Sequence, residues 1–281
     1  MMKRVACLAL VAGCDVTLTD DRQAIVGGSL DAHDEAVVAI VQRPVCDDAA
    51  TIVCSGTLIA PQVVLTAAHC VMPDAAYEVH VGSPVGSGTF IAVTEMMRHP
   101  LFDDATHAYD LGVLRLGQSS AVAPIALPTA TLDASFIGAV ARVVGYGVVA
   151  AGAIADGERR EGTMQIASVD TLTFAATPAP NNTCGGDSGG AVFIGEQLLG
   201  ITVAGDPTCT TNAVDGRVDI AIADFIQPFV DAPAPLPPPG SGDPCMKPPM
   251  PGDDGCSTGH GVGAWIALLF IGCRSKRRAR A

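Results

Sequence analysis

The sequence predicts an all-β globular domain closed by one C-terminal helix. Of the 281 residues, 31 are glycine and 20 are proline, and this composition suits many short strands joined by turns better than long helices. Short apolar runs separated by Gly, Pro, Asp and Asn recur from residue 25 to about residue 230. A period of 3.6 residues appears only near the end of that segment, in IADFIQPFV around Asp224, which predicts the closing helix.

The apolar runs should supply most of the strands. Each run is short, rich in β-branched or aliphatic residues, and bounded by residues that favour turns. In chain order the runs are TIVCSGTLIA (51–60), VVLTAAHC (63–70), YEVHVG (77–82), DLGVLRL (110–116), AVARVVGYG (139–147), AVFIGEQLLGITVAG (191–205) and RVDIAI (217–222).

The N-terminus is typical of an export signal. In MMKRVACLALVAGCD, Lys3 and Arg4 form a charged start, and Val5–Gly13 form an apolar run that is too short to span a bilayer. We expect residues 1–24 to hold this signal and a short propeptide. The end of the run, LVAGC, resembles a bacterial lipoprotein signal in which Cys14 would be lipidated. The alternative is an ordinary cleaved signal in which Cys14 has no special role.

The composition changes after residue 231. Residues 232–255 are rich in Pro, Gly and Asp, cannot bury a core, and should form an extended spacer. Residues 256–281 place a cysteine, about a dozen apolar residues and an arginine-rich end in that order, and the apolar run is shorter than the ~20 residues of a transmembrane helix. This order resembles the C-terminal sorting tails of myxobacterial surface proteins, which implies that the tail is processed and that Cys256 becomes the anchor point. The alternative is a plain tail anchor with its basic end in the cytoplasm, and both interpretations place the protein at a membrane.

The charge of the chain argues against nucleic-acid binding. The net charge is −13, and residues 25–231 hold seven arginines, no lysine and 23 acidic residues, which gives that segment a charge of −16. Nucleic-acid binding requires basic faces that displace counterions, so we interpret the acidity as solubility outside the cell. Ten cysteines favour an oxidising compartment if those of the globular part are paired.

Four motifs carry the chemistry: IVGG at 25–28, TAAHC at 66–70, DLGVLRL from Asp110, and CGGDSGG at 184–190. A serine hydroxyl is a weak nucleophile at neutral pH and needs an adjacent base, which an imidazole can supply because it titrates near neutrality. A glycine-rich loop lets backbone N–H groups approach an oxyanion closely. In content and in order these motifs resemble the chymotrypsin/trypsin-like serine proteases, and the resemblance covers about residues 25–230. The order His, Asp, Ser differs from that of subtilisin-like and α/β-hydrolase enzymes.

The resemblance implies a fold and an activity. For residues 25–231 it implies two antiparallel six-stranded β-barrels followed by the C-terminal helix. It further implies a secreted serine endopeptidase that forms an acyl-enzyme, needs no cofactor or metal, cuts protein or peptide substrates and has a monomeric protease domain; the tail would attach it to the cell surface. One alternative is a catalytically inactive homologue that serves as a surface binding module, and another is a structural surface protein, against which the intact IVGG argues.

The resemblance also assigns catalytic roles. Ser188 would be the nucleophile, His69 the general base, and Asp110 the carboxylate that holds His69 in the correct tautomer. Asp103 and Asp104 are rivals of Asp110 by proximity alone, but Asp110 begins an apolar strand that would fix its geometry. The other histidines sit in no comparably specific motif and are assigned to surface or strand positions: His33, His80, His99, His107 and His260.

Two further features of the nucleophile loop follow from the resemblance. The amides of Gly186 and Ser188 are expected to form the oxyanion hole. Cleavage between Ala24 and Ile25 is expected to free an α-amino group that pairs with Asp187, because a buried carboxylate without a partner is costly. The chain would therefore be made as a zymogen. No Lys or Arg precedes Ile25, so a trypsin-like activating protease does not fit.

The resemblance pairs four cysteines. Cys54 with Cys70 would hold the histidine loop, and Cys184 with Cys209 would close the substrate pocket. Cys46 is left over, either as a buried free thiol or as the partner of Cys14, Cys245 or Cys256.

Counting back from Cys184 places Asn182 at the base of the primary specificity pocket. Val203–Gly205 would pair with the substrate, and Gly216 would lie across the pocket. An asparagine offers hydrogen bonds but no charge, so a substrate Lys or Arg would be desolvated without a counter-ion unless Asp206 or Asp215 reached in. The sequence therefore favours cleavage after neutral residues, apolar or amide-like.

Overall fold

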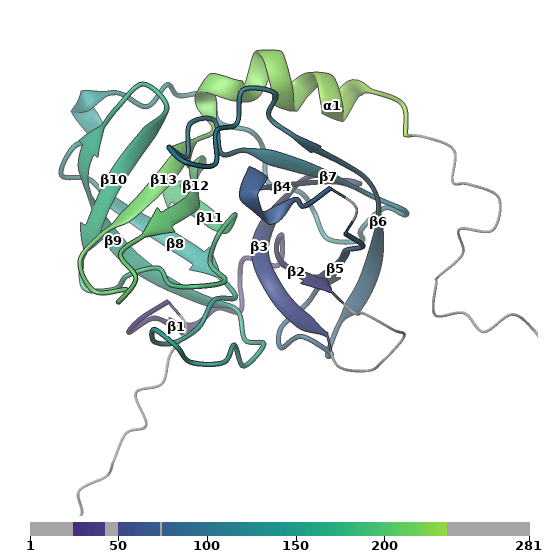
Figure 1. Ribbon diagram of the computed structural model, residues 1–281, viewed down its shortest axis with the longest axis horizontal. Helices are drawn as coiled ribbons and strands as arrows, with labels where there is room; N and C mark the ends of the chain where they lie inside the picture. The colour runs from purple at the N-terminus through teal and green to yellow at the C-terminus, as the bar shows by residue number, and fades with distance from the viewer. Residues whose placement is uncertain (1–24, 43–49, 74, 235–281) are drawn as a thin grey trace, which may run out of the picture. The chain divides into compact units, whose positions relative to one another are not determined.

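The computed structural model describes residues 25–42, 50–73 and 75–234 (Figure 1). Within these ranges the chain forms thirteen β-strands and one α-helix. The predicted signal at 1–24, Cys46, most of the spacer at 232–255 and the tail at 256–281 lie outside the described residues.

The first barrel is built from the strands β2 to β7. They pair in the closed order β2-β3-β4-β7-β6-β5, and all pairs are antiparallel. In β4 (VVLT) every residue is buried, as the unbroken apolar run predicts. The bounds are β2 Val37–Gln42, β3 Thr51–Ala60, β4 Val63–Thr66, β5 Glu78–Val81, β6 Thr89–Arg98 and β7 Gly112–Leu116.

The second barrel is built from the strands β8 to β13. It closes because β8 pairs with both β9 and β11, and the short strand β1 (Ser29–Leu30) adds to β9. The two closed antiparallel six-stranded barrels confirm the predicted fold. The bounds are β8 Val140–Gly145, β9 Arg160–Val169, β10 Thr173–Pro178, β11 Ala191–Ile194, β12 Gln197–Gly205 and β13 Ala213–Arg217.

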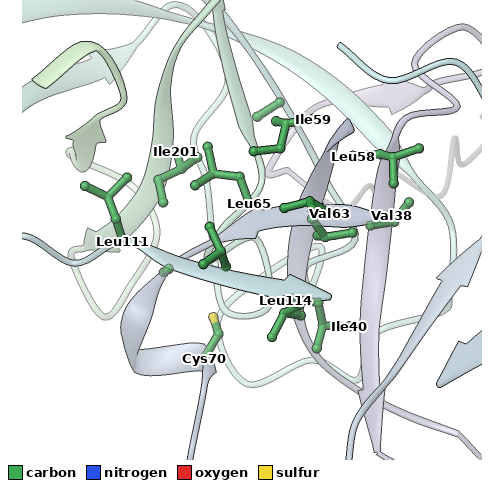
Figure 2. Close-up of a cluster of buried hydrophobic side chains, with 14 of the residues drawn as sticks. Val38, Ile40, Leu58, Ile59, Val63, Leu65, Cys70, Leu111, Leu114 and Ile201 are labelled. Atoms are coloured by element: carbon green, nitrogen blue, oxygen red, sulfur yellow. The ribbon is translucent and has the colours of Figure 1, made fainter. Parts of the chain in front are cut away.

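One hydrophobic cluster joins the two barrels. Leu65 and Leu114 from β4 and β7 belong to the same buried cluster as Ile201 from β12 (Figure 2). Leu111, the residue after Asp110, is also part of it and is 1% exposed. Burial of apolar surface on both sides of the interface therefore holds the barrels together and fixes the start of β7.

The closing helix α1 (Gln227–Asp231) continues from a π-helical turn at Ile222–Ile226. Phe225 and Phe229 are buried in the inter-barrel cluster, which docks this end of the chain on the domain. None of the helices in the described ranges is long and apolar enough to span a bilayer.

The apolar pattern predicts a strand at RVDIAI (217–222), but only Arg217 of this run belongs to a strand. Strand β13 ends at Arg217, and Asp219–Ala221 form a 3₁₀ turn that leads into the closing helix. Asp219 lies 2.7 Å from Arg217 Nη2 and accepts a hydrogen bond from Leu132 N at 3.1 Å. These polar contacts turn the chain out of the sheet, where the apolar pattern alone predicted that the strand would continue.

Candidate active site

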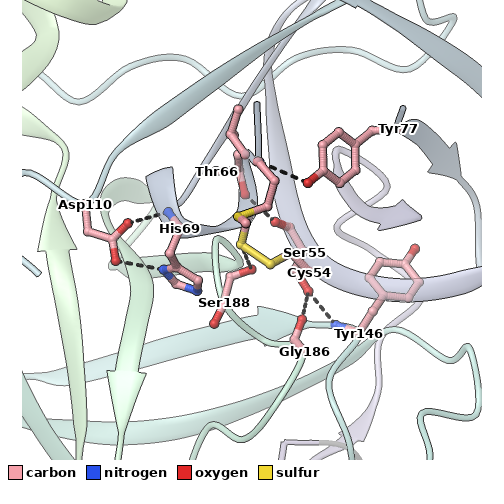
Figure 3. The surroundings of a disulfide bond; sticks show 12 residues. Cys54, Ser55, Thr66, His69, Tyr77, Asp110, Tyr146, Gly186 and Ser188 are labelled. Carbon is pink, nitrogen blue, oxygen red and sulfur yellow. Dashed lines mark hydrogen bonds and ion pairs between the residues drawn. A yellow bond between two sulfur atoms is a disulfide. The ribbon is translucent and has the colours of Figure 1, made fainter. Parts of the chain in front are cut away.

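His69 and Asp110 meet because the strands beside them are paired. His69 lies in the 3₁₀ turn Ala68–Cys70 directly after β4, Asp110 lies just before β7, and these two strands are hydrogen-bonded to each other. The Asp110 carboxylate accepts two hydrogen bonds from His69: Oδ2 lies 2.7 Å from Nδ1 and Oδ1 lies 2.9 Å from the backbone N (Figure 3). Since an ionised carboxylate only accepts hydrogen bonds, Nδ1 of His69 carries its proton and Nε2 is left free as a base.

Asp110 is ionised despite its burial. The residue is 1% exposed, and burial opposes ionisation, but hydrogen bonds from His69 and His107 outweigh it, so the pKa of Asp110 lies below its ordinary value. Asp103, a rival by proximity, instead folds back on its own loop and accepts hydrogen bonds from Ala105 N and Thr106 N.

The loop around Ser188 reaches across from the second barrel to the first. The carbonyl of Ser188 accepts a hydrogen bond from Ser55 N at 2.8 Å and lies 3.7 Å from Cys70 Sγ. Because Cys70 directly follows His69, these contacts bring Ser188 into the region of the imidazole, as Figure 3 shows. The Ser188 hydroxyl makes no hydrogen bond to another residue of the described ranges, so it can rotate toward His69 or a substrate.

Only glycine fits at Gly189 in this loop. Its φ is +78°, and a Cβ there would lie 2.1 Å from Thr66 Oγ1 and 2.4 Å from the Ser55 carbonyl. A side chain would therefore push the Ser188 loop away from the first barrel.

The two amides expected to form the oxyanion hole donate no hydrogen bond within the described residues. Among the described residues, neither Gly186 N nor Ser188 N donates to another backbone or side-chain group. The peptide after Gly186 is held in place because the Gly186 carbonyl accepts a hydrogen bond from Ser55 Oγ at 2.9 Å. Ser55 Oγ in turn accepts a hydrogen bond from Tyr146 N at 2.9 Å (Figure 3). The loop thus presents two free donors on a fixed backbone.

Asp187 is buried, and no basic side chain of the described residues forms an ion pair with it, although Arg160 is near enough to lower its pKa. Asp187 is 1% exposed and accepts hydrogen bonds from Gly147 N at 2.8 Å and Cys184 N at 2.9 Å. Burial raises the pKa of Asp187 to about 7, and these hydrogen bonds offset only part of that rise. Ile25 is fully buried, and Val26 N donates to the Asn182 carbonyl at 2.8 Å.

Both expected disulfides are present. Cys54 is bonded to Cys70, and Cys184 is bonded to Cys209, with Cα–Cα distances of 6.1 Å and 5.2 Å. The first links β3 to the turn that carries His69, and the second links the loop around Ser188 to the chain before β13. Two disulfides fit an oxidising compartment.

A cavity of about 300 Å³ opens beside Ser188. Its lining includes Thr183, Cys184, Thr202 and Gly205. Asn182, the residue before Thr183 of this lining, is 2% exposed; its Nδ2 donates to the Asn212 carbonyl at 3.4 Å, and its Oδ1 is buried with no hydrogen-bond partner among the described residues.

Val203 and Gly216, which the sequence predicts at the substrate pocket, are not among the residues that line this cavity. Val203 is buried in the inter-barrel cluster, and a Cβ on Gly216 would lie 3.2 Å from Val203 Cγ1 and 3.7 Å from the Asp110 carbonyl. The Cβ side of Gly216 therefore faces Val203 and the backbone carbonyl of Asp110, and successive residues of a strand point to opposite faces. Its neighbour Asp215 faces the opposite way.

His107 contacts the site although no sequence motif marks it. Its Nδ1 lies 3.0 Å from Asp110 Oδ2, and its ring stands edge-on to that of His69 with the centroids 6.1 Å apart. The sequence assigned it to the surface, and the only available signal was its position three residues before Asp110 in a loop whose conformation the pattern does not reveal.

Three groups of described side chains place potential metal ligands close together, and each has another partner. One contains the Cys54–Cys70 disulfide, and one is the pair of histidines on Asp110. The third is an acidic group that pairs with Arg142 and Arg159 and consists of Asp31, Asp34 and Glu161.

Comparison with known proteins identifies similar sequences over the same segment. A family model named Trypsin matches residues 25–226. A trypsin of Saccharopolyspora erythraea is 33% identical over 172 residues, which cover 54% of this chain and 75% of that protein. A trypsin of Simulium vittatum is 28% identical over 185 residues (57% and 73%), and snake venom serine protease 3 of Craspedocephalus gramineus is 27% identical over 194 residues (58% and 71%). The segment matched by the family model contains both barrels and the residues His69, Asp110 and Ser188.

Proposed function

Since this chain belongs to the trypsin family and is a serine-type endopeptidase, we propose that Ser188, His69 and Asp110 are its catalytic triad. The observation that carries the proposal is the pair of hydrogen bonds that His69 donates to Asp110, from a turn that also contacts the Ser188 carbonyl through Cys70. The buried carboxylate fixes both the tautomer and the orientation of the imidazole.

The proposed reaction is acyl transfer. Ser188 Oγ attacks the carbonyl carbon of the scissile peptide bond while His69 Nε2 accepts the hydroxyl proton. The resulting oxyanion receives hydrogen bonds from the amides of Gly186 and Ser188. When the C–N bond breaks, His69 returns the proton to the leaving amine, and water then hydrolyses the acyl-enzyme by the same proton transfers.

Labelling with a fluorophosphonate probe tests this proposal. The chain that begins at Ile25 should bind the probe covalently, and Ser188→Ala and His69→Ala should abolish labelling. Ser168→Ala, which removes an exposed serine of β9, is the matched control and should label as the parent does. An unlabelled parent with correctly formed disulfides would favour the alternative, an inactive homologue that serves as a binding module.

We also propose that the enzyme is a zymogen activated by cleavage at Ala24–Ile25. The support is Asp187, whose buried carboxylate has no cationic partner among the described residues and whose pKa is raised to about 7. A new Ile25 ammonium would supply that partner and stabilise the ionised form. N-terminal sequencing of active protein should begin Ile-Val-Gly-Gly, and full activity with Ala24 still attached would refute the proposal. Cleavage of Ser188→Ala in culture would show that a separate protease performs the activation.

For location we propose export through residues 1–24 and surface attachment through residues 256–281. The sequence patterns and the disulfides support this proposal. A chain that ends at Asp231 should leave the membrane fraction once Ile25 is its first residue. Cys14→Ser and Cys256→Ser, each tested for loss of lipid incorporation, would identify the lipidated cysteine.

For specificity we propose neutral residues at the cleaved position when the pH is neutral. Asn182 is uncharged, and none of the residues that line the cavity is cationic or anionic except Asp206, which is half-buried. A peptide-library profile at pH 7 that was dominated by Arg and Lys would contradict this expectation.

A further inference from the structure

A second histidine shares the catalytic carboxylate. Asp110 Oδ2 accepts from His69 Nδ1 at 2.7 Å and lies 3.0 Å from His107 Nδ1, while Oδ1 accepts from His69 N at 2.9 Å. This carboxylate is fully buried at the side-chain level, whereas the side chains of His69 and His107 are 26% and 38% exposed. The two imidazoles therefore reach one buried charge from the solvent side.

The protonation pattern follows from the acceptor. An ionised carboxylate has no proton to donate, so both Nδ1 atoms must carry hydrogen for both contacts to be hydrogen bonds. Each neutral ring then has a bare Nε2. Protonation of His107 would place a positive charge on a ring whose centroid is 6.1 Å from that of His69, a range in which like charges oppose each other's protonation.

The loop holds His107 in this position at a conformational cost. His107 has φ +55° and Tyr109 has φ +51°, a region that non-glycine residues seldom adopt. The Tyr109 ring stacks on buried His99 with centroids 4.6 Å apart and an interplanar angle of 9°. On the other side, Asp103 N donates to the Ala108 carbonyl at 3.0 Å. Contacts on both sides of His107 thus stabilise an otherwise unfavourable backbone.

We propose that His107 is a positioning residue: its hydrogen bond to Asp110 holds the carboxylate, and its ring keeps His69 unprotonated, so that proteolysis continues to lower pH than a His69–Asp110 pair alone would allow. The proposal rests on the proposed triad. Two effects of His107 both disfavour protonation of His69. The second hydrogen bond to Asp110 reduces the negative charge that His69 experiences, and a protonated His107 repels a proton on His69.

The other charged groups near His107 leave this assignment intact. In its own loop, the Asp103 carboxylate is engaged with Ala105 and Thr106, and Asp104 is exposed. From the facing elements, Asp110 forms a hydrogen bond with its ring and His69 an edge-on ring contact, and no other ion pair or ring contact of His107 occurs among the described residues.

The test is the pH profile of kcat/KM for two variants with different chemistry. His107→Asn keeps a hydrogen-bond donor and tolerates positive φ but cannot titrate, whereas His107→Ala removes both effects. We expect the acidic limb to move to higher pH in both variants, by up to about one pH unit in His107→Ala and by less in His107→Asn. His33→Asn, an exposed histidine in another loop, should leave the profile unchanged.

A structural role alone predicts a different result. It would lower kcat or the unfolding temperature equally at every pH and leave the acidic limb in place, and that outcome, or a shift to lower pH, would overturn the proposal. A readout that does not need activity is the titration of the His69 Nδ1 proton by NMR in Ser188→Ala, which should also move upward when His107 is replaced. Failure of the parent enzyme to label with fluorophosphonate would contradict the proposed function, whereas an unmoved NMR titration would contradict the role of His107.

Discussion

At the residue scale, Asp215 is a buried carboxylate next to the lining of the cavity beside Ser188. It lies directly opposite Thr202 in the β12–β13 pair, and such partners point to the same face of a sheet. Thr202 lines the cavity, so Asp215 lies behind the same wall, away from Gly216 and the triad. Both carboxylate oxygens are buried with no hydrogen-bond partner in the described ranges. Burial raises the pKa of Asp215 to about 8, and the nearby Thr202 hydroxyl acts in the opposite direction.

The first prediction concerns specificity. Below about pH 8 Asp215 is neutral, and above it the pocket wall gains a negative charge that can pair with a basic side chain. The ratio of kcat/KM for an Arg peptide to that for the matching Gln peptide should therefore rise from pH 7 to pH 9. Asp215→Asn should abolish the rise. In the control Asp206→Asn the rise should persist, because hydrogen bonds from Thr208 and Thr211 hold the pKa of Asp206 far below this range.

The second prediction concerns the stability of the uncleaved chain. Asp187 keeps its proton up to about pH 7 when folded, whereas an unfolded aspartate loses it near 3.8. Between these values the unfolded state binds fewer protons, so the free energy of unfolding must fall as the pH rises. Urea unfolding of Ser188→Ala from pH 4 to pH 8 should show this loss, of the order of a few kcal/mol.

The control for Asp187 is the double variant with Asp187→Asn. Between pH 4 and pH 7 its free energy of unfolding should fall less steeply with pH than that of Ser188→Ala, and the difference is the contribution of Asp187. Cleavage at Ala24–Ile25 should also flatten the slope, since the new ammonium stabilises the carboxylate. Equal slopes in all three proteins would show that Asp187 does not couple folding to pH.

At the element scale, the closing helix is held by one arginine and one aromatic ring. Arg115 of β7 is 3% exposed; its Nη2 donates to the Phe229 carbonyl at 2.6 Å, and its guanidinium lies 4.4 Å from the centre of the Phe229 ring. Its Nε also donates to Glu95 at 2.7 Å. The short helix α1 is thus stabilised by packing and not by its own length.

The third prediction tests this docking. Phe229→Ala removes a buried ring and should lower the free energy of unfolding by about 3–5 kcal/mol, measured by urea denaturation in Ser188→Ala. Val230→Ala, the half-buried neighbour, should cost about 1 kcal/mol. A cost for Phe229→Ala no larger than that of Val230→Ala would mean that the helix is not fixed by this ring.

At the scale of the whole molecule, Ser55 joins the barrels at the catalytic loop. It belongs to β3 of the first barrel, and its backbone N donates to Ser188 O while its hydroxyl bridges Gly186 O and Tyr146 N of the second. The oxyanion loop is therefore held in place by a residue of the opposite barrel.

The fourth prediction separates this link from general packing. Ser55→Ala leaves a buried amide and carbonyl without partners, which should cost about 1–3 kcal/mol of stability and lower kcat by about tenfold with little change in KM. Thr57→Val on the same strand removes a buried hydroxyl that has no hydrogen-bond partner among the described residues, so it should stabilise the protein by about 1 kcal/mol without altering kcat. A larger effect on KM than on kcat in Ser55→Ala would contradict the proposed link.

The sequence by itself determined the family, the two-barrel fold and most strands, because apolar runs and turn residues are local patterns and the four motifs are contiguous. It also assigned His69 and Asp110 before their contact was visible. Only the tertiary structure decided that His107 reaches Asp110, since that contact depends on positive-φ backbone in a loop. It likewise decided that Gly216 faces Val203 and the Asp110 backbone while Asp215 lies on the opposite face of β13 with Thr202, because a single residue of register exchanges the two faces of a strand. The burial of Asp187 without an ion pair to any described residue could not be read from the chain either, because it depends on how residues far apart in sequence enclose one carboxylate.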